Sequence, residues 1–429
     1  MLLSKYIQIN TTNPPGNEIA AAKFLKEKFL ADGIPAAVFE PQPGRGIVAA
    51  RLLGINKHNK TLILLSHMDV VPAEPTEWQQ PPFSGLVKDG EIWGRGALDD
   101  KGPGIVELMA MLAVKRSGIT LNRDVLFLAT ADEEEGGRQG AGWVVDHQSD
   151  LIVDAGFVLN EGGGIRLDKD GHDYYAVSTA EKAPFWLRLT ASGTSGHAST
   201  PPEQTAVTHL VRALNRLIDY VPPTKVVPPV QSYFRIMAQL GRRPAEFADL
   251  AKALKDPAFA KKFLSDPSQS AAVRDTITPT VLSGSLKTNV IPAAAAAGID
   301  CRLLPGDDPN AMLTKLRDVI ADNTIKIDEL LNFPSVSSPD KSALMTAIQT
   351  LAKTHDKLPV VPTMLNGFTD SHYFRQKGLV AYGFIPLEFG EAQGRMVHGA
   401  NERIAIKDLR DGIERMVDLL KTFGGRSSQ

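Results

Sequence analysis

The sequence of 429 residues has one cysteine, Cys301, and nine histidines. A single cysteine cannot form an intramolecular disulfide, and it excludes a zinc site built from several thiolates. Any metal in this protein must therefore be bound by histidine and carboxylate side chains. Because histidine is scarce, the position of each histidine carries information about where such a site would lie.

Long apolar runs and an excess of one charge are also absent. The most apolar windows, 108–114 and 291–299, are far shorter than the roughly 18 residues of a membrane-spanning helix, so we expect no membrane span. Lys and Arg total 47 and Asp and Glu total 49, which gives a net charge of −2. This balance argues against a broad nucleic-acid or anionic-membrane surface, and we expect neither as a partner.

The first residues, MLLSKYIQIN, lack the charged segment and apolar stretch of a signal peptide. We therefore expect a cytoplasmic protein, although a secreted protein whose signal is absent from this chain fits the sequence equally well. Hydrophobic residues make up 43% of the chain, which is enough to bury a core and excludes disorder as the main state. At roughly 150 residues per domain, the length predicts two or three domains.

Strands and helices alternate along the outer parts of the sequence. Short apolar runs bounded by turn residues predict buried strands at 47–53, 61–65, 125–129, 156–159 and 380–385. Apolar residues at helical spacing predict helices around 105–112, 207–218 and 409–420. This alternation is typical of an α/β domain with a mostly parallel sheet.

The middle of the sequence differs from the two ends. Apolar and polar residues alternate from 185 to 191, which suits a sheet with one packed face, and a strand over 298–304 and a helix over 309–321 follow. We therefore predict a smaller α+β domain, 180–335, inserted into an α/β domain formed by 1–179 and 336–429. Within it, 222–279 is rich in proline and charge, and we interpret this segment as an insertion or a flexible lid.

Histidine and acidic residues follow three of the predicted strands directly. His67 comes after the strand at 61–65, the acidic run 132–135 comes after the strand at 125–129, and Glu161 comes after the strand at 156–159. Because the carboxyl ends of parallel strands meet at one crevice, these side chains are expected to converge, as a metal site requires. A solvated acidic loop is the alternative interpretation of 132–135.

Two further segments suit a metal site but are ambiguous alone. His67 and Asp69 point the same way in an extended segment, so the Asp69 carboxylate can fix the tautomer of His67; the alternative is a buried histidine with a local hydrogen bond. Asp99 lies in a glycine-rich segment, 93–102, just before a predicted helix, where an ordinary acidic helix start is the alternative. Of the remaining histidines, we assign six to the surface or to structure: His58, His147, His172, His209, His355 and His372.

Taken together, these residues resemble the di-zinc metallopeptidase and amidohydrolase family of aminoacylase, carboxypeptidase G and succinyl-diaminopimelate desuccinylase. The motifs of that family occur in order along nearly the whole chain, at 12–18, 66–72, 94–102, 132–134, 161, 196–197, 289–292 and 398. Further motifs, including Trp78 with 82–85 and the segment 367–371, resemble the carboxypeptidase S and N-acyl-amino-acid hydrolase branch. Phe368 departs from this pattern, because a small residue is common there elsewhere in the family.

The resemblance implies a metal ligand set. His67 and Glu161 would bind one zinc ion, Glu134 and His398 the other, and Asp99 would bridge the two. Co²⁺ or Mn²⁺ could substitute for zinc. The peptide bond after Asp99 would be cis, as in relatives.

The resemblance also implies roles for residues around the metals. Glu133 would be the general base, and Asp69 would support His67. The fold would be a mostly parallel-sheet zinc-peptidase catalytic domain with an inserted α+β lid or dimerisation domain, through which a homodimer could form. In that domain His197 would contact the substrate carbonyl oxygen, and Asn289 and Arg302 would bind the substrate carboxylate.

The implied reaction is hydrolysis of an amide or peptide bond next to a free carboxylate, through a water that bridges the metals. The substrate would be a small N-acyl-amino acid or a short peptide, as for a carboxypeptidase or an N-acyl-amino-acid amidohydrolase. Dipeptidase or deacylase activity of the same family is an alternative. Two more distant alternatives are a two-metal phosphoesterase, which uses similar ligands, and a non-catalytic metal-binding scaffold.

Overall fold

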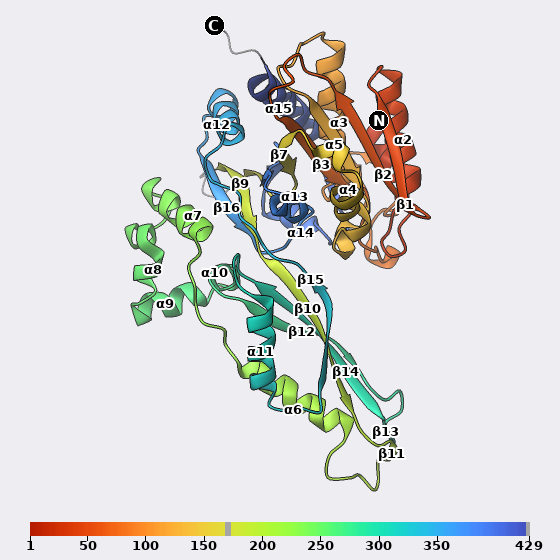
Figure 1. Ribbon diagram of the computed structural model, residues 1–429, viewed down its shortest axis with the longest axis vertical. Helices are drawn as coiled ribbons and strands as arrows, with labels where there is room; N and C mark the ends of the chain where they lie inside the picture. The colour runs from red at the N-terminus through yellow and green to blue at the C-terminus, as the bar shows by residue number, and fades with distance from the viewer. Residues whose placement is uncertain (168–172, 426–429) are drawn as a thin grey trace. The chain divides into compact units, whose positions relative to one another are not determined.

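The computed structural model describes residues 1–167 and 173–425, shown in Figure 1. The chain divides into two compact units. Unit 1 comprises Met1–Thr179, Ser338–Thr363 and Thr369–Gln429, and unit 2 comprises Ala180–Ser337 and Met364–Phe368. The short segment Met364–Phe368 groups with unit 2 although the sequence analysis assigned it to the outer domain. In the described residues, no helix has the length and apolarity needed to cross a membrane.

Unit 1 is built on a ten-stranded sheet with the order β1-β2-β6-β3-β7-β17-β9-β8-β18, and β16 pairs with β9. Strands β3, β6, β7 and β17 are parallel, whereas the pairs at the β1 edge and around β9 are antiparallel. The strand bounds are β1 Ala36–Gln42, β2 Arg45–Leu52, β3 Thr61–His67, β6 Val125–Thr130, β7 Ala155–Asn160, β8 Gly164–Arg166, β9 Tyr174–Glu181, β16 Val360–Leu365, β17 Val380–Gly383 and β18 Glu388–Phe389. The predicted fold class and the five predicted strands are confirmed.

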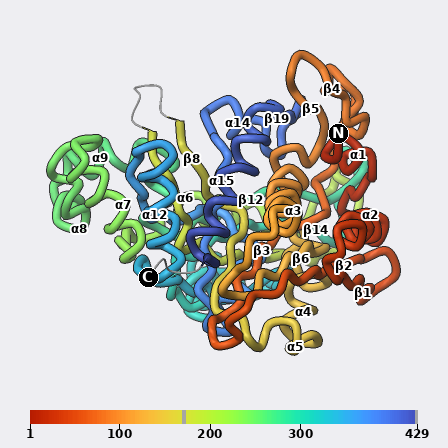
Figure 2. The backbone as a smooth tube through the Cα atoms, turned by 90° about the horizontal axis from the view of Figure 1, so that it is seen from above, coloured from red at the N-terminus to blue at the C-terminus, as the bar shows by residue number. Residues whose placement is uncertain are grey.

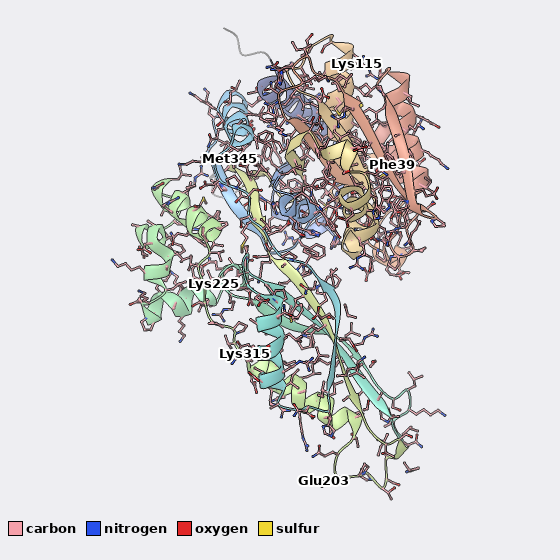
Figure 3. All side chains as sticks on the ribbon, viewed as in Figure 1. Phe39, Lys115, Glu203, Lys225, Lys315 and Met345 are labelled. Atoms are coloured by element: carbon pink, nitrogen blue, oxygen red, sulfur yellow. The ribbon has the colours of Figure 1, made fainter. Side chains whose placement is uncertain are left out.

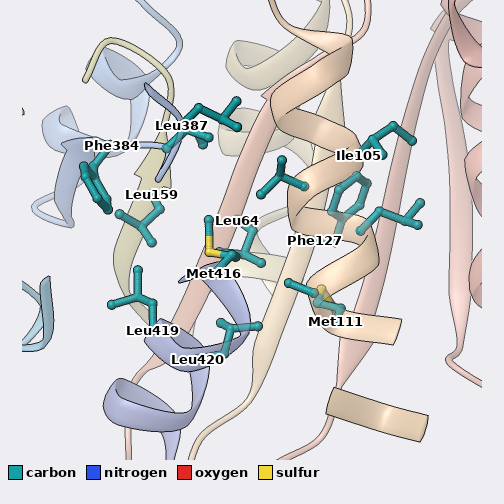
Figure 4. Close-up of a cluster of buried hydrophobic side chains, with 14 of the residues drawn as sticks. Leu64, Ile105, Met111, Phe127, Leu159, Phe384, Leu387, Met416, Leu419 and Leu420 are labelled. Atoms are coloured by element: carbon teal, nitrogen blue, oxygen red, sulfur yellow. The ribbon is translucent and has the colours of Figure 1, made fainter. Parts of the chain in front are cut away.

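Helices cover both faces of this sheet because its central strands are apolar on both sides. One face packs against α1 (Leu2–Ile7), α2 (Glu18–Ala31), α3 (Lys101–Arg116), α12 (Ala343–His355) and α15 (Ile406–Gly424). The other face packs against α4 (Trp143–His147), α5 (Ser149–Ile152) and α13 (Ser371–Gln376). Figure 2 shows α3 beside α15, and Figure 4 shows side chains of both helices meeting Leu64 and Phe127 of the sheet.

Smaller elements complete unit 1. A three-stranded sheet joins β4 (Val87–Lys88), β5 (Glu91–Trp93) and β19 (Arg403–Ala405). Short helical segments lie at η1 (Pro75–Glu77), η2 (Glu133–Glu135), η3 (Arg138–Gly142) and α14 (Glu391–Met396). The pairing of β5 with β19 brings the glycine-rich segment after Trp93 next to the residues that precede Arg403.

Unit 2 contains a four-stranded antiparallel sheet with the order β12-β14-β10-β15. The strands are β10 (Ala183–Ser192), β12 (Thr276–Ser283), β14 (Ala294–Leu303) and β15 (Lys326–Asn332). Every second residue of β10 and β14 is buried against α6 (Ala206–Asp219) and α11 (Pro309–Ile320). A short ribbon pairs β11 (Gly196–His197) with β13 (Val290–Ile291). The predicted alternation over 185–191 is confirmed.

The proline-rich segment predicted as an insertion or flexible lid forms packed helices with a core of their own. They are α7 (Pro228–Gln239), η4 (Ala245–Asp249), α8 (Leu250–Ala253), α9 (Pro257–Leu264) and α10 (Pro267–Ala272). Three of the prolines begin helices, where their missing N–H costs no hydrogen bond. Lys225, labelled in Figure 3, connects the beginning of this segment to its end, because its backbone N–H donates to Val273 O at 2.7 Å. The ammonium group of Lys225 forms an ion pair with Asp307.

Candidate metal centre and substrate-binding residues

The order of strands in unit 1 brings the predicted ligands together. β3 lies between β6 and β7, and all three strands are parallel, so their carboxyl ends adjoin. His67 ends β3, η2 follows β6, and Glu161 follows β7. The convergence predicted from the strand ends is therefore present in the fold.

Two groups of potential metal ligands share Asp99. In the first group, His67 Nε2 lies 2.9 Å from Asp99 Oδ1 and 3.8 Å from Glu161 Oε1. In the second group, His398 Nε2 lies 3.1 Å from Asp99 Oδ2 and 3.2 Å from Glu134 Oε2. Because each carboxylate oxygen of Asp99 faces a different histidine, this residue has the geometry of a bridging ligand.

The donor set fits two cations. Burial and the neighbouring charges of Asp99 and Glu134 raise the pKa of Glu161 well above its usual range. Burial likewise raises the pKa of Glu134, and Glu134 Oε1 has no hydrogen-bond partner among the described residues. Hydrogen bonds to Asp99 and Glu134 raise the pKa of His398 to about 10. Such crowding of buried carboxylates is relieved by positive charge, and imidazole with carboxylate oxygen suits zinc and related divalent metals.

The support of His67 differs in detail from the sequence prediction. His67 Nδ1 lies 2.9 Å from the backbone carbonyl oxygen of Asp69 and 3.5 Å from its carboxylate, so the carbonyl is the nearer acceptor. The Asp69 carboxylate instead accepts the backbone N–H groups of Glu133 and Glu134, each at 3.1 Å. Asp69 thus positions the acidic loop after β6 as well as the histidine.

A buried polar network behind Asp69 was not found from the sequence. Asn13 Nδ2 donates to Asp69 Oδ2 at 2.8 Å, and Arg45 Nη1 donates to Asn13 Oδ1 at 3.1 Å. Arg45 also pairs with Glu18 at 3.1 Å and with Asp132 at 2.5 Å. Asn13 and Glu18 belong to the motif at 12–18, so the resemblance marked the segment without giving the roles of its residues.

A second support missed by the sequence analysis is Glu402. Its carboxylate is fully buried and accepts the backbone N–H groups of Gly96, Leu98 and Asp99 at 3.0, 2.7 and 3.1 Å. It also pairs with Arg95 Nη1 at 2.8 Å. Glu402 therefore fixes the glycine-rich loop that carries the bridging carboxylate. The peptide bond after Asp99 is cis, as the resemblance implied.

Glu133 lies beside the ligand groups without belonging to either of them. Its side chain is buried, and burial together with Glu161 raises its pKa well above the usual range. Asp370, a residue without a predicted role, is also buried; Thr130 donates to its Oδ2 at 2.7 Å, and its Oδ1 has no hydrogen-bond partner in the described part of the chain. Burial raises the pKa of Asp370 to about 8.

The three predicted substrate-binding residues outside the metal groups all lie in unit 2. His197 is exposed on β11, where the Ser199 N–H donates to its Nδ1 at 3.2 Å, which leaves the proton of a neutral ring on Nε2. Asn289 is exposed next to the paired strand, and its carbonyl accepts the Ala198 N–H at 3.1 Å. The ribbon thus brings His197 and Asn289 together, whereas Arg302 lies on β14 and pairs with Asp300.

Neither group of potential ligands includes any of the five described histidines that were assigned to the surface or to structure. His58 and His147 are exposed, His209 pairs with Asp322, and His355 pairs with Asp418. His372 is buried, and burial lowers its pKa to about 3. His172 lies outside the described residues.

Two histidine–carboxylate groups that share one aspartate, next to the carboxyl ends of parallel strands in an α/β sheet, are the arrangement of a dinuclear metallohydrolase. The model of peptidase family M20/M25/M40 matches residues 63–422, and the chain belongs to this family. The predicted family, and with it the predicted metallohydrolase of amide or peptide bonds, is confirmed.

Individual relatives agree with this assignment. The chain is 32% identical over 362 residues to the N-fatty-acyl-amino acid synthase/hydrolase of Xenopus tropicalis, covering 83% of this chain and 70% of that protein. It is 27% identical over 427 residues to aminoacylase-1 of Sus scrofa, covering 98% and 94%. Among solved structures, an M20-family metallo-carboxypeptidase of Sulfolobus solfataricus has a TM-score of 0.77 at 22% identity, covering 98% of each chain. This last likeness concerns the fold.

Proposed function

We propose that this protein is a zinc-dependent hydrolase that cleaves the amide bond of small N-acyl-amino acids or of short peptides, next to a free carboxylate. The observation that supports the proposal is the pair of ligand groups that share Asp99. The buried carboxyl of Glu133 lies beside them and belongs to neither group. The relatives support the substrate class, since they are named for N-fatty-acyl-amino acid and acyl-amino acid chemistry.

In this proposal His67, Asp99 and Glu161 would hold one metal ion, and Asp99, Glu134 and His398 would hold the other. Bound divalent metals would supply Lewis-acid chemistry toward the substrate carbonyl and the attacking water. Glu133 takes the proton of the attacking water and delivers it to the leaving nitrogen. Glu133 is buried beside the ligand groups, and burial raises its pKa above the usual range of a carboxyl group.

Unit 2 supplies the other roles in the proposal. His197 donates from Nε2 to the developing oxyanion, where one such donor is typically worth about 2.7–4 kcal/mol. Asn289 and Arg302 bind the substrate carboxylate, because a planar guanidinium matches a carboxylate in two parallel hydrogen bonds. Carboxypeptidase, dipeptidase and acylase activity differ in the group that supplies the carbonyl of the cleaved bond: a peptide, a single amino acid or an acyl chain.

The deciding experiment is a hydrolysis screen of the zinc-reconstituted protein. The substrates are N-acyl-amino acids of increasing acyl length, dipeptides, and p-nitrophenyl phosphate as the test of the phosphoesterase alternative. We expect turnover of N-acyl-amino acids or peptides and none of the phosphate ester. Exclusive turnover of the phosphate ester, or of acyl amides that lack a carboxylate, would refute the proposal.

We further propose a homodimer through unit 2. β12 is an edge strand that exposes Val281 and Leu282, and α6 exposes Val207 and Val211 next to it. Residues of both elements line a groove of about 550 Å³. Sedimentation equilibrium of the parent protein and of Val211→Glu tests this. A dimeric parent protein and a monomeric variant support the proposal, and a monomeric parent protein refutes it.

The cytoplasmic location stays a prediction, which cell fractionation can test.

A further inference from the structure

The two faces of the unit 2 sheet differ in chemistry. On β14, Ile299, Cys301 and Leu303 are buried in the core under α6 and α11. Asp300 and Arg302 alternate with them and therefore lie on the opposite face. In the register of the sheet, Trp186 stands opposite Asp300 on β10. One face of this sheet thus carries a core, and the other carries a charged pair and an indole ring.

Arg302 keeps part of its guanidinium available. Its Nε and Nη2 donate to the two carboxylate oxygens of Asp300 at 2.7 and 3.0 Å. This ion pair uses one edge of the planar group, and no described residue accepts a hydrogen bond from Nη1. The side chain is 22% exposed, so the Nη1–Nη2 end can meet a second carboxylate.

Aromatic rings flank this guanidinium. The Arg302 guanidinium carbon lies 5.6 Å from the Trp186 ring centre and 5.1 Å from that of Phe368. Trp186 and Phe368 lie 5.9 Å apart, Phe333 lies 5.3 Å from Phe368, and both pairs meet edge to face. Trp186 Nε1 also donates to Asp300 Oδ1 at 3.0 Å, so the carboxylate orients the arginine and the indole together.

We propose that Trp186, Phe333 and Phe368 form the subsite for the side chain of the amino acid whose carboxylate binds Arg302, and that this side chain is aromatic or large and aliphatic. The inference rests on the proposed function. In an amino acid the carboxylate and the side chain leave the same carbon atom. A carboxylate held at Arg302 therefore places that side chain within a few ångströms of the rings, where apolar surface is removed from water.

Phe368 is the residue that distinguishes this subsite from a generic carboxylate clamp. It comes from Met364–Phe368, the segment that groups with unit 2, and its ring centre lies 5.1 Å from the Arg302 guanidinium carbon. A glycine at 368 would leave the clamp of Asp300 and Arg302 intact and remove one wall of the subsite. The competing interpretation is that the rings only hold the Arg302 side chain in place. In that case, kcat/KM for every carboxylate substrate depends on the rings equally.

The test compares kcat/KM for N-acetyl-phenylalanine, N-acetyl-leucine and N-acetyl-glycine in the zinc-loaded parent protein, Phe368→Gly and Phe368→Leu. Because apolar pockets discriminate by roughly 10–200-fold per group, we expect Phe368→Gly to lower kcat/KM for the phenylalanine substrate at least tenfold and for the glycine substrate less than about threefold. Phe368→Leu retains apolar bulk and should keep most of the preference. Arg302→Lys is the matched control, since it keeps the three rings but loses the planar group that binds a carboxylate in two hydrogen bonds, and it should affect all three substrates alike.

Equal losses for all three substrates in Phe368→Gly would overturn the subsite and leave the proposed function standing. A parent protein that hydrolyses none of the three and cleaves only the phosphate ester in the screen would refute the proposed function itself. A parent protein that prefers the glycine substrate would also overturn the subsite. Thermal melting checks the fold of each variant; if Phe368→Gly is unfolded, Trp186→Leu tests the same ratio of substrates.

Discussion

The substitution Glu402→Gln tests whether Glu402 holds the loop that carries Asp99, the proposed bridging ligand. The side chain accepts three backbone N–H groups of the loop from Gly96 to Asp99 and one N–H of Arg95, and it is fully buried. Glutamine keeps the shape but replaces one oxygen with an NH₂ group, which faces donors instead of accepting from them. Arg95, only 3% exposed, loses its counter-ion at the same time.

Removing one partner of a buried ion pair typically costs about 3–5 kcal/mol, against a total stability of about 5–15 kcal/mol for a domain. We therefore expect Glu402→Gln to lower the free energy of unfolding by about 3–5 kcal/mol. We also expect weaker zinc binding, since the backbone of Asp99 loses its anchor. Residues outside the ligand set that orient a ligand typically contribute about 10–100-fold in metal affinity.

Urea unfolding of the metal-free protein measures the first quantity, and competition with a chromophoric chelator measures the second. Glu391→Gln is the control, because Glu391 on α14 is 80% exposed and, among residues 1–167 and 173–425, forms an ion pair only with Arg395 one turn away. An exposed pair of this kind is worth about 0.3–0.5 kcal/mol. If Glu402→Gln is as stable as Glu391→Gln and binds zinc as tightly as the parent protein, the assigned role of Glu402 is wrong.

The remaining predictions concern the proposed chemistry. Glu133→Gln should bind zinc normally in a chelator competition yet lose about 10²–10⁴-fold in kcat, and retained turnover would remove Glu133 from the base role. Arg302→Ala should raise KM for carboxylate substrates by roughly 30-fold or more, equivalent to about 2 kcal/mol, with a smaller change in kcat; an unchanged KM would contradict the clamp. Asn13→Ala should cost about 1.5–3 kcal/mol of unfolding free energy in urea and weaken zinc binding, because Asp69 loses a donor; a loss of stability with unchanged zinc affinity would limit Asn13 to a structural role. Stripping the metal should lower the melting temperature, because a ligand at 100 times its Kd stabilises by about 2.7 kcal/mol; an unchanged melting curve after exhaustive chelation would show that the folded protein holds no tightly bound metal.

The proximity of His67 and Glu161 could be predicted from the sequence because it depends on topology. His67 and Glu161 stand at the ends of neighbouring parallel strands, and the strand-end rule brings them together without atomic detail. Asp99 and His398 are not at strand ends, and they entered the predicted site only through the resemblance to a known family. Their proximity depends on the pairing of β5 with β19, which no local pattern reveals.

The sequence did not predict which distant residues form hydrogen bonds with Asp69 and Glu402. Asn13 is 56 residues from Asp69 and Gly96 is 306 residues from Glu402, so neither contact leaves a local signal. The sequence also could not decide between the two acceptors that Asp69 offers to His67, since the carbonyl and the carboxylate belong to the same residue.

The proline-rich insertion shows a different limit. Proline at Pro228, Pro257 and Pro267 was taken as a sign of irregular chain, but each begins a helix. Asp256 and Asp266 cap two of these helices by accepting backbone N–H groups, at 2.8 and 2.9 Å. The Asp-Pro pairs were therefore helix-start signals, and composition alone concealed them.

The order of the proposed ligands along the chain also governs when each of them becomes available while the protein is being made. His67, Asp99 and Glu161 emerge early, whereas His398 follows Glu161 by roughly 240 residues, or about 12–50 s at a synthesis rate of 5–20 residues per second. All of unit 2, Met364–Phe368 included, is translated between these two moments. A nascent chain, or one broken off between Glu161 and His398, therefore contains every proposed ligand of the first group and lacks the histidine of the second.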